Sequence, residues 1–465
     1  MIIAITIFIL FFLGLALIHL DWAVLLLIAS LPAYLIRFNV GGLPLTLLEV
    51  MILIAFGVWF YKFFLPDFKA SKKRQEKRWP YPYAKEIILV IVISFLAAGV
   101  SGFSINALGI WKAYFFEPIL FFLLIFNVFK DKKELNKIFW AFLISMGAVS
   151  ALAIFQKITG LLIANPFWAA AESRRIVSFF GYPNAVGLYL APLIMLVNGW
   201  LFSLPWKNIC DQIGKKLIII TIIIASLLAI YFARSEGALI GLAAALFVFG
   251  LSAGKKLRIF TLSLLIIGTT IVFTSKPIQN FIWTKISLQD LSGEIRQQQW
   301  KETLTMLKND RIISGAGLNN YQAAIKPYHQ EGIFFNSDKR PNFDAVVWAS
   351  STLRTKYWQP VEIYLYPHNI WLNFWSELGL LGAIIFMWLI GKYLLQATKL
   401  YTLLKRQENS ERYLILGLAT AMITILVHGL VDVPYFKNDL AAMFWLLFAL
   451  LGIFDLNYGV RRQKK

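Results

Sequence analysis

The stretch LIIITIIIASLLAIYFARSEGALIGLAAALFVFGLSA, residues 217–253, decides the fold class of this chain. Two apolar runs, 217–233 and 237–253, flank a short polar turn that begins with Arg234. A helix of about 20 apolar residues, with a lower limit near 17, crosses the roughly 30 Å of hydrocarbon in a bilayer. The stretch therefore predicts two membrane-spanning helices, with a cation at the boundary between them.

The composition of the whole chain agrees with this prediction. Of its 465 residues, 59% are apolar without counting the 29 glycines, and only 15% are charged, whereas about 25% of the residues in a soluble domain are charged. A soluble protein of this length cannot bury so much apolar surface, which excludes the soluble, disordered, fibrous and disulfide-rich classes. The single cysteine, Cys210, excludes intramolecular disulfides and cysteine-rich metal sites.

The chain is predicted to be an all-α polytopic membrane protein with 12 to 13 transmembrane helices. The predicted spans are 2–19, 22–36, 44–65, 87–103, 108–128, 138–163, 184–204, 217–233, 237–253, 258–274, 369–391, 413–431 and 438–456. Two spans in 2–36 give thirteen helices and an outside N-terminus, whereas one span or a re-entrant pair gives twelve and an inside N-terminus. Asp21 favours a break within 2–36, and no cleavable signal peptide is expected because no basic segment precedes the first apolar run.

Basic residues mark every second connection between the predicted spans. Six clusters hold 26 of the 45 basic residues: Lys69, Lys72, Lys73, Arg74, Lys77, Arg78 and Lys85; Lys130, Lys132, Lys133 and Lys137; Lys207, Lys215 and Lys216; Lys255, Lys256 and Arg258; Lys392, Lys399, Lys405, Arg406 and Arg412; Arg461, Arg462, Lys464 and Lys465. This alternation follows the positive-inside rule and predicts a cytoplasmic C-terminus, with 164–183, 275–367 and 432–437 outside. Nucleic-acid binding would need a single basic face instead, so no nucleic-acid partner is expected. The expected environment of the chain is the lipid bilayer.

We expect three regions along the chain: transmembrane helices over 1–274, a large extracytoplasmic loop over 275–367, and C-terminal helices with a basic tail over 368–465. The loop begins with a helical pattern in which Ser292 is the predicted cap. Asn309-Asp310 and the glycines at 315 and 317 are predicted to end this helix. The aromatic content of the rest of the loop argues against disorder and favours a folded cap over the membrane domain.

Ionisable residues at membrane boundaries are costly and need an explanation. Arg234, Arg296 and the Arg174-Arg175 doublet are candidates for an anion site, because a guanidinium binds phosphate through two parallel hydrogen bonds. Interfacial anchoring remains open for Arg234 and for the doublet, and so does a pairing of Arg234 with Glu236. A solvated role remains open for Arg296, which has Trp300 one turn later on the same helical face.

His368 stands at the outer end of the long span that starts at 369, and it is the best general-base candidate because histidine titrates near neutrality. A capping or interfacial role is the alternative. His428 and Asp432 are spaced i, i+4 and are predicted to share one helical face, as a supporting pair or as a purely structural one. No phosphate-binding lysine loop, dinucleotide fold or cluster of metal ligands is found in the sequence, so neither a cofactor nor a metal is expected.

Four pieces in order resemble the O-antigen ligase and polymerase superfamily of bacterial envelope proteins, over about 180–435. The pieces are Phe180-Gly181-Tyr182-Pro183-Asn184 with Gly187; Arg234-Ser235-Glu236-Gly237-Ala238-Leu239; Arg296 to Trp300 leading to Asp310-Arg311 and Gly315-Ala316-Gly317-Leu318; and Pro367-His368-Asn369 followed by Glu377-Leu378-Gly379-Leu380-Leu381-Gly382. The segment from His428 to Asp432 is similar to a late helix of that family.

The resemblance implies a membrane-embedded glycosyltransferase of the C type (GT-C-like) in the bacterial inner membrane, with its active site on the extracytoplasmic face. Such a protein moves a glycan from undecaprenyl diphosphate to a hydroxyl of a glycolipid, glycan or protein acceptor. In this sequence Arg234 and Arg296 match arginines that bind the diphosphate, and His368 matches the catalytic histidine. Asn184 and Asn369 lie within the matching pieces as supporting residues.

The sequence departs from the family at the first arginine: the family often reads Ser-Arg-Gly, whereas here Ser235 and Glu236 stand between Arg234 and Gly237. A carboxylate at this position is expected to compete with phosphate for Arg234. The leading interpretation is an inverting, metal-independent polysaccharide ligase that joins glycans to lipid A–core or a related acceptor. The alternatives are a polymerase, a protein O-oligosaccharyltransferase of the same superfamily, or a flippase for lipid-linked glycans.

Overall fold

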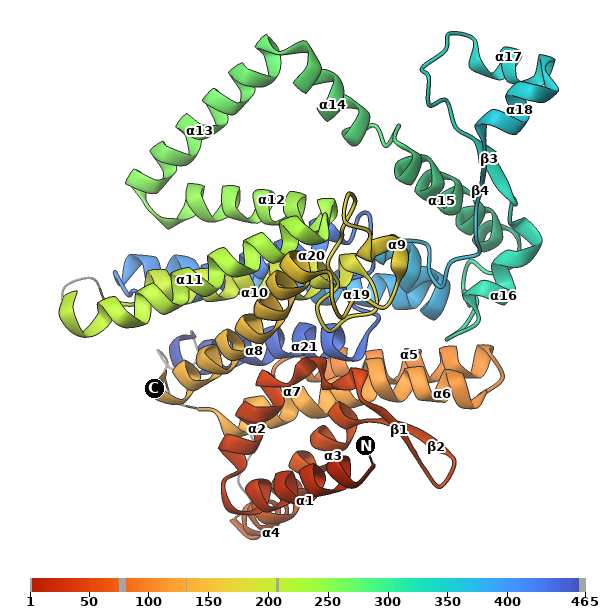
Figure 1. Cartoon of the computed structure of the whole chain (residues 1–465). Coiled ribbons are helices and arrows are strands. Elements are labelled where there is room, and N and C mark those ends of the chain that lie inside the picture. Colours follow the sequence, from red (N-terminus) through yellow and green to blue (C-terminus); the bar gives the residue numbers. More distant parts are fainter. Residues whose placement is uncertain (1, 75–80, 131, 206–208, 460–465) are drawn as a thin grey trace.

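The computed structural model describes residues 2–74, 81–130, 132–205 and 209–459, which form an almost wholly helical protein (Figure 1). Strands are confined, within these ranges, to two small antiparallel pairs, β1 (Arg37–Val40) with β2 (Leu43–Thr46) and β3 (Gly332–Phe334) with β4 (Trp358–Pro360). Several residues of the basic clusters lie outside the described residues, among them Lys77, Arg78, Lys207, Arg461, Arg462, Lys464 and Lys465.

Nine helices in the described residues are long and apolar enough to cross a membrane. Two of them combine several elements: Leu47–Lys69 contains α3 (Leu47–Trp59), the π-helical turn η2 (Phe60–Phe64) and part of α4 (Leu65–Arg74), and Ile105–Val128 contains α6 (Ile105–Trp111), the π-helical turn η3 (Lys112–Phe116) and α7 (Glu117–Val128). Glu134–Thr159 and Ile213–Ala233 are the apolar parts of α8 (Lys132–Thr159) and α11 (Ile209–Ala233). The others are Pro183–Ser203 (α10), Glu236–Ala253 (α12), Lys255–Thr274 (α13), Ile370–Arg406 (α19) and Asn438–Tyr458 (α21). Shorter apolar helices are α1 (Ile2–Ile18), α2 (Leu20–Ala29) and α20 (Arg412–His428), and α5 covers Ala84–Val100. The chain is therefore an all-α polytopic membrane protein.

The prediction of a span over 22–36 is wrong. Helix α2 ends at Ala29 and a 3₁₀ turn, η1 (Leu31–Leu35), follows with Pro32 in its first positions. The chain then forms the β1–β2 hairpin, whose turn contains Gly41 and Gly42 at positive φ. A helix of ten residues is about 15 Å long, which is half of the hydrocarbon thickness.

Two helices, α10 and α21, lie at the centre of the bundle. In each of them, 89% of the residues in the membrane-spanning stretch are buried within the protein. Helix α10 crosses α20 at a contact between two glycines, Gly199 and Gly417. A Cβ atom built on Gly199 would lie 2.5 Å from the Tyr413 carbonyl oxygen and 2.7 Å from the Gly417 Cα atom. The small residues permit this backbone approach, which is a frequent way for helices to associate in membranes.

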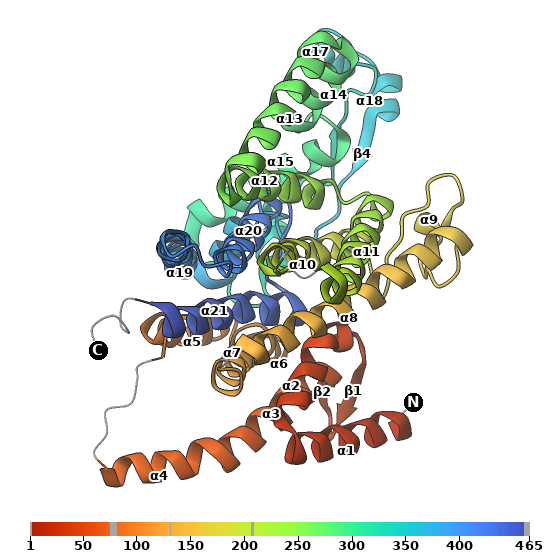
Figure 2. The ribbon, with the colours of Figure 1, turned by 90° about the vertical axis from the view of Figure 1, so that its left-hand side faces the viewer.

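Helix α13 is the least enclosed span, with no buried residue. Figures 1 and 2 both show it leaving the bundle together with α14 (Lys276–Ile286), on the side opposite to α1 and α4. Its exposed aliphatic side chains suit contact with lipid.

The segment after α14 is folded and contains α15 (Leu291–Asp310), α16 (Tyr321–Ile325), the 3₁₀ turn η4 (Lys326–Tyr328), α17 (Phe343–Ala349), α18 (Ser351–Tyr357) and the β3–β4 pair. Its small core contains Met306, Leu307 and Tyr321. The predicted cap of α15 is corrected: Asp290, not Ser292, is the N-cap, and its Oδ1 accepts a hydrogen bond from the Gly293 amide. Helix α15 starts at Leu291, so Asp290 is in the N-cap position and Ser292 lies inside the first turn.

The glycine-containing segment after α15 fixes the cap to the long helix α19. The Ala316 amide donates to the Ser376 carbonyl at 2.6 Å, and the Leu380 amide donates to the Ile313 carbonyl at 3.2 Å. Gly315 and Gly379 both have positive φ, and α19 is kinked at Gly379. A Cβ atom on Gly315 would lie 2.6 Å from the Ser376 carbonyl oxygen, so glycine is required for this close contact.

Candidate functional site

Four connections meet at one end of the bundle: the loop 160–182, the turn 234–235, the segment 361–369 and the turn 429–437. We call this the site end. The Arg175 amide donates to the Trp168 carbonyl within the loop 160–182, and the Ile176 amide donates to the Phe232 carbonyl at the end of α11, directly before the turn 234–235. The Ile370 amide donates to the Gly429 carbonyl at 2.7 Å. Segments far apart in the sequence are thereby held together, and helix α15 covers them.

Helix α15 contacts the site end through two residues spaced one turn apart, as the sequence predicts. The Trp300 indole N–H donates to the Pro367 carbonyl at 2.9 Å. The Arg296 Nε donates to the Val431 carbonyl at 3.1 Å, and its Nη1 donates to the Ser292 hydroxyl at 2.7 Å. Arg296 therefore keeps part of its guanidinium available while its stem is fixed beside the turn after α20.

His368 contacts this helix through Gln299. Its Nδ1 is 3.1 Å from the Oε1 atom of Gln299, and its ring makes edge-on contacts with Tyr364 and Tyr366 at 5.1 Å between ring centroids. Its backbone has φ 47°, in the left-handed region that costs a non-glycine residue free energy. Burial lowers the pKa of His368 below its usual value of 6.5; nearby Asp432 opposes this shift and Arg296 adds to it. The imidazole is thus kept neutral and able to accept a proton.

The residue after His368 anchors the start of α19. Asn369 is the N-cap, and its Oδ1 accepts hydrogen bonds from the Trp371 and Leu372 amides. Its Nδ2 donates to the Leu430 carbonyl at 3.0 Å. These bonds give Asn369 a positioning role next to the histidine.

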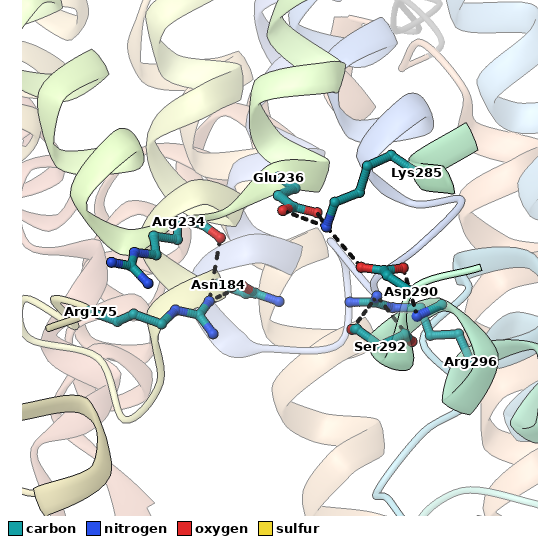
Figure 3. Close-up of polar contacts among 9 residues, drawn as sticks. Arg175, Asn184, Arg234, Glu236, Lys285, Asp290, Ser292 and Arg296 are labelled. Atoms are coloured by element: carbon teal, nitrogen blue, oxygen red, sulfur yellow. Dashed lines mark hydrogen bonds and ion pairs between the residues drawn. The ribbon is translucent and has the colours of Figure 1, made fainter. Parts of the chain in front are cut away.

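Arg175 is the member of the predicted doublet that reaches the other candidates. Its Nε donates to the Ala233 carbonyl at 3.0 Å, and its Nη2 donates to Asn184 Oδ1 at 3.1 Å and to the Arg234 carbonyl at 3.4 Å (Figure 3). Asn184 in turn donates to Asp432 Oδ2 at 3.2 Å. Burial and the charges of Arg234 and Arg296 lower the pKa of Arg175, and the charge of Glu236 opposes this shift.

Arg174 points elsewhere. Its Nη1 donates to the Lys157 carbonyl at 2.9 Å and its Nε donates to the Ala169 carbonyl at 3.3 Å. The structure therefore separates the two neighbouring arginines and uses Arg174 to hold the loop 160–182 to the end of α8.

Arg234 stands in the turn between α11 and α12 and is exposed, with φ 52°. The carboxylate of Glu236, two residues later, lies 2.8 Å from the Lys285 Nζ through both of its oxygens, and the same Nζ lies 2.8 Å from Asp290 Oδ2 (Figure 3). Within the described part of the chain, the Arg234 side chain makes no hydrogen bond or ion pair. Glu236 thus pairs with a lysine from α14 rather than with Arg234.

The prediction that His428 and Asp432 share a helical face is wrong. Helix α20 ends at His428, Gly429 caps it, and Asp432 lies in the turn beyond, where it accepts hydrogen bonds from Asn184 and from the Val433 amide. His428 is 2% exposed and packs under the start of α12, since a Cβ atom on Gly237 would lie 2.6 Å from its Cδ2 atom. The two residues therefore lie on either side of a helix end, and Asp432 contacts Asn184.

Sequence reasoning also missed three residues at the site end. Gln299 and Lys285 are described above. The third is Lys437, whose Nζ lies 3.8 Å from the centroid of the Tyr182 ring. Burial lowers the pKa of Lys437 to about 8, while the charges of Asp439 and Asp432 oppose this shift. Glutamine and lysine are common outside membrane spans, so only the spatial neighbours of these residues distinguish them.

A large hollow of the protein lies away from the site end. Lys85, Lys392 and Arg406 are among its lining residues, and none of the candidate site residues lines it. In the part of the chain that the structure describes, no group of three or more histidine, cysteine, aspartate or glutamate side chains could hold a metal ion.

Comparison with known protein families gives a match over part of the chain. Residues 221–387, about a third of the chain, match the family model Wzy_C, described as O-antigen ligase. The matched region contains Arg234, Arg296 and His368, while Arg175 and Asp432 lie outside it. No curated protein matches the chain.

The match supports a membrane glycosyltransferase of the O-antigen ligase or polymerase type, whose donors are lipid-linked glycans. It supports the predicted resemblance at three of the four sequence pieces: residues 221–387 are similar to the O-antigen ligase family, and the first piece, at 180–187, lies outside the match.

Proposed function

We propose that this protein transfers a glycan from undecaprenyl diphosphate to a hydroxyl group of a surface glycolipid such as lipid A–core, with inversion and without a metal. The site end then faces the extracytoplasmic side of the bacterial inner membrane, and the C-terminus is cytoplasmic. One observation carries the proposal: a neutral, half-buried histidine lies at the same end of the bundle as three arginines from three separate segments.

The arginines supply the charge that the reaction needs. When the bond between the anomeric carbon and the diphosphate oxygen breaks, its electron pair stays on the leaving diphosphate. Arg234, Arg296 and Arg175 are proposed to stabilise this negative charge, since fixed donors stabilise charge where it develops. Arg175 and Arg296 are already held by backbone carbonyls, so little reorganisation is needed.

His368 is proposed to act as the general base. The acceptor hydroxyl loses its proton to the imidazole while its oxygen forms the new bond to the anomeric carbon. Attack from the side opposite to the diphosphate inverts the configuration at that carbon. Asn369, which caps the next helix, keeps the histidine at the bundle surface.

The test is transfer by the purified protein with a defined polyprenyl-diphosphate glycan and a panel of acceptors: a lipid A–core glycolipid, a free glycan and a glycosylatable peptide. We expect a glycolipid product, one released polyprenyl diphosphate per transfer, an inverted linkage and no loss of rate in a chelator. A retained configuration or abolition by chelator contradicts the mechanism, and preference for the glycan or the peptide contradicts the assigned acceptor.

A further inference from the structure

Gln299 is a buried amide that contacts the proposed base from a different segment of the chain. It is 4% exposed and lies in the middle of α15, between Arg296 and the cap core. Its Oε1 atom is 3.1 Å from His368 Nδ1. A buried polar side chain normally has a partner, and for Gln299 that partner is the histidine ring 69 residues later.

We propose that Gln299 is a positioning residue that holds His368 in the tautomer with its proton on Nδ1, so that Nε2 is the nitrogen that accepts the proton of the acceptor hydroxyl. This inference rests on the proposed function. It assigns a role to a residue outside the arginines and the histidine that the sequence pieces identify.

The chemistry of the contact determines the tautomer. An amide oxygen can only accept a hydrogen bond, so the ring nitrogen that faces it must carry the proton. Within the described residues, His368 Nε2 makes no hydrogen bond, which leaves its lone pair available. The partner of one ring nitrogen thereby fixes the state of the other.

Two neighbouring contacts hold this geometry. The Trp300 indole N–H, one residue after Gln299, donates at 2.9 Å to the carbonyl of Pro367, the residue before His368. Asn369 caps α19 on the other side of the histidine. The strained φ of His368 persists because these contacts determine its position from both sides.

The reaction step then balances as follows. The acceptor O–H proton moves to Nε2, and the acceptor oxygen bonds to the anomeric carbon. The electron pair of the broken carbon–oxygen bond leaves with the diphosphate. His368 becomes a cation whose Nδ1–H still donates to a neutral amide, so Gln299 orients the ring and adds no charge of its own.

The first experiment compares Gln299→Glu with wild type in the transfer assay over a range of pH. A carboxylate in the same place stabilises the imidazolium, beside the existing charges of Asp432 and Arg296 and the rings of Tyr364 and Tyr366. We expect the acidic limb of the kcat/KM profile to move to higher pH by about one unit. An unmoved limb overturns the proposal.

The second experiment uses Gln299→Met, which keeps the length of the side chain and removes the acceptor. We expect kcat to fall roughly 10- to 100-fold, because part of the general-base contribution is lost, while the donor KM changes little. Gln298→Met is the matched control: Gln298 bonds Glu302 instead of the histidine, and this variant should keep the wild-type profile. Equal kcat values for the two variants overturn the proposal.

Nitrogen-15 NMR of histidine-labelled protein gives a readout that does not require activity. The chain has four histidines, and the signals lost in His368→Ala identify the ring. We expect a neutral ring protonated on Nδ1 in wild type and a tautomer mixture in Gln299→Met. Wild type that transfers no glycan would refute the proposed function alone, whereas an active wild type with its proton on Nε2 would refute the role of Gln299 alone.

Discussion

The Lys285 ammonium lies 2.8 Å from both carboxylate oxygens of Glu236. Lys285 comes from α14 and Glu236 from the first turn of α12, next to Arg234. The same ammonium contacts the N-cap of α15, Asp290, and the two carboxylates raise the pKa of Lys285 despite its partial burial. The carboxylate of Glu236, where the sequence departs from the family, is therefore paired with Lys285 and not with Arg234. The Arg234 guanidinium remains available to a ligand.

Replacing Lys285 tests this pairing. In Lys285→Met, Glu236 keeps an uncompensated charge beside Arg234, and we expect the donor KM to rise about two- to fivefold, the range of an exposed ion pair. Transfer kinetics with the lipid-linked donor measure it. The double variant Glu236→Gln/Lys285→Met should regain the wild-type donor KM. If its donor KM is as high as that of Lys285→Met, Lys285 itself binds the donor and the pairing does not explain the effect.

The Arg174-Arg175 doublet offers a matched pair of variants. Arg175→Ala should raise the donor KM roughly tenfold or more, because a hydrogen bond to a charged group is worth about 1.5–3 kcal/mol. Arg174→Ala should leave the donor KM unchanged and lower the thermal stability, because Arg174 bonds the Lys157 and Ala169 carbonyls. Binding and melting measurements on both variants separate the roles, and equal loss of donor affinity would contradict them.

The pH dependence of the reaction follows from the lowered pKa of His368. A base acts in its neutral form, so a pKa below 6.5 places the acidic limb of kcat/KM below pH 6.5 and leaves the enzyme active in mild acid. Asp432 raises this pKa in the wild type, so Asp432→Asn should move the limb to still lower pH. A wild-type limb above pH 6.5, or an upward shift in the variant, would count against the assignment.

The crossing of α10 and α20 is predicted to tolerate no side chain. In Gly199→Ala the new Cβ atom would lie 2.5 Å from a backbone oxygen of α20, so the two helices must separate. We expect a loss of about 1–3 kcal/mol in stability, as for other overpacked contacts, measured as a lower melting temperature in detergent. Gly391→Ala, at a position with nothing within 4 Å of the new atom, is the control that should melt like wild type.

The sequence predicts the class of fold well because hydropathy reports burial in lipid directly. It fails where a helix ends inside an apolar run. Over 22–36 the helix ends at Ala29, before the 3₁₀ turn that contains Pro32 and the β1–β2 hairpin with its glycines. Over 413–431 the helix ends at His428, which leaves Asp432 in the turn beyond. A period of apolar residues does not show where a helix ends.

Within the candidate site, the arginines and His368 remain predictions that rest on residue type, since ionisable residues at the ends of apolar spans need an explanation. Residue type could not distinguish Arg175 from Arg174, because only the fold decides which guanidinium points to Asn184. It also gave no signal for Gln299, whose contact with His368 joins positions 69 residues apart. Such contacts between distant segments appear only when the segments are assembled.

The most direct test of the central claim is the transfer rate of purified His368→Ala at saturating donor. The account predicts a loss of at least about 100-fold, the lower range for a general base, with donor affinity and melting temperature close to wild type. Full turnover in a folded His368→Ala protein would contradict it.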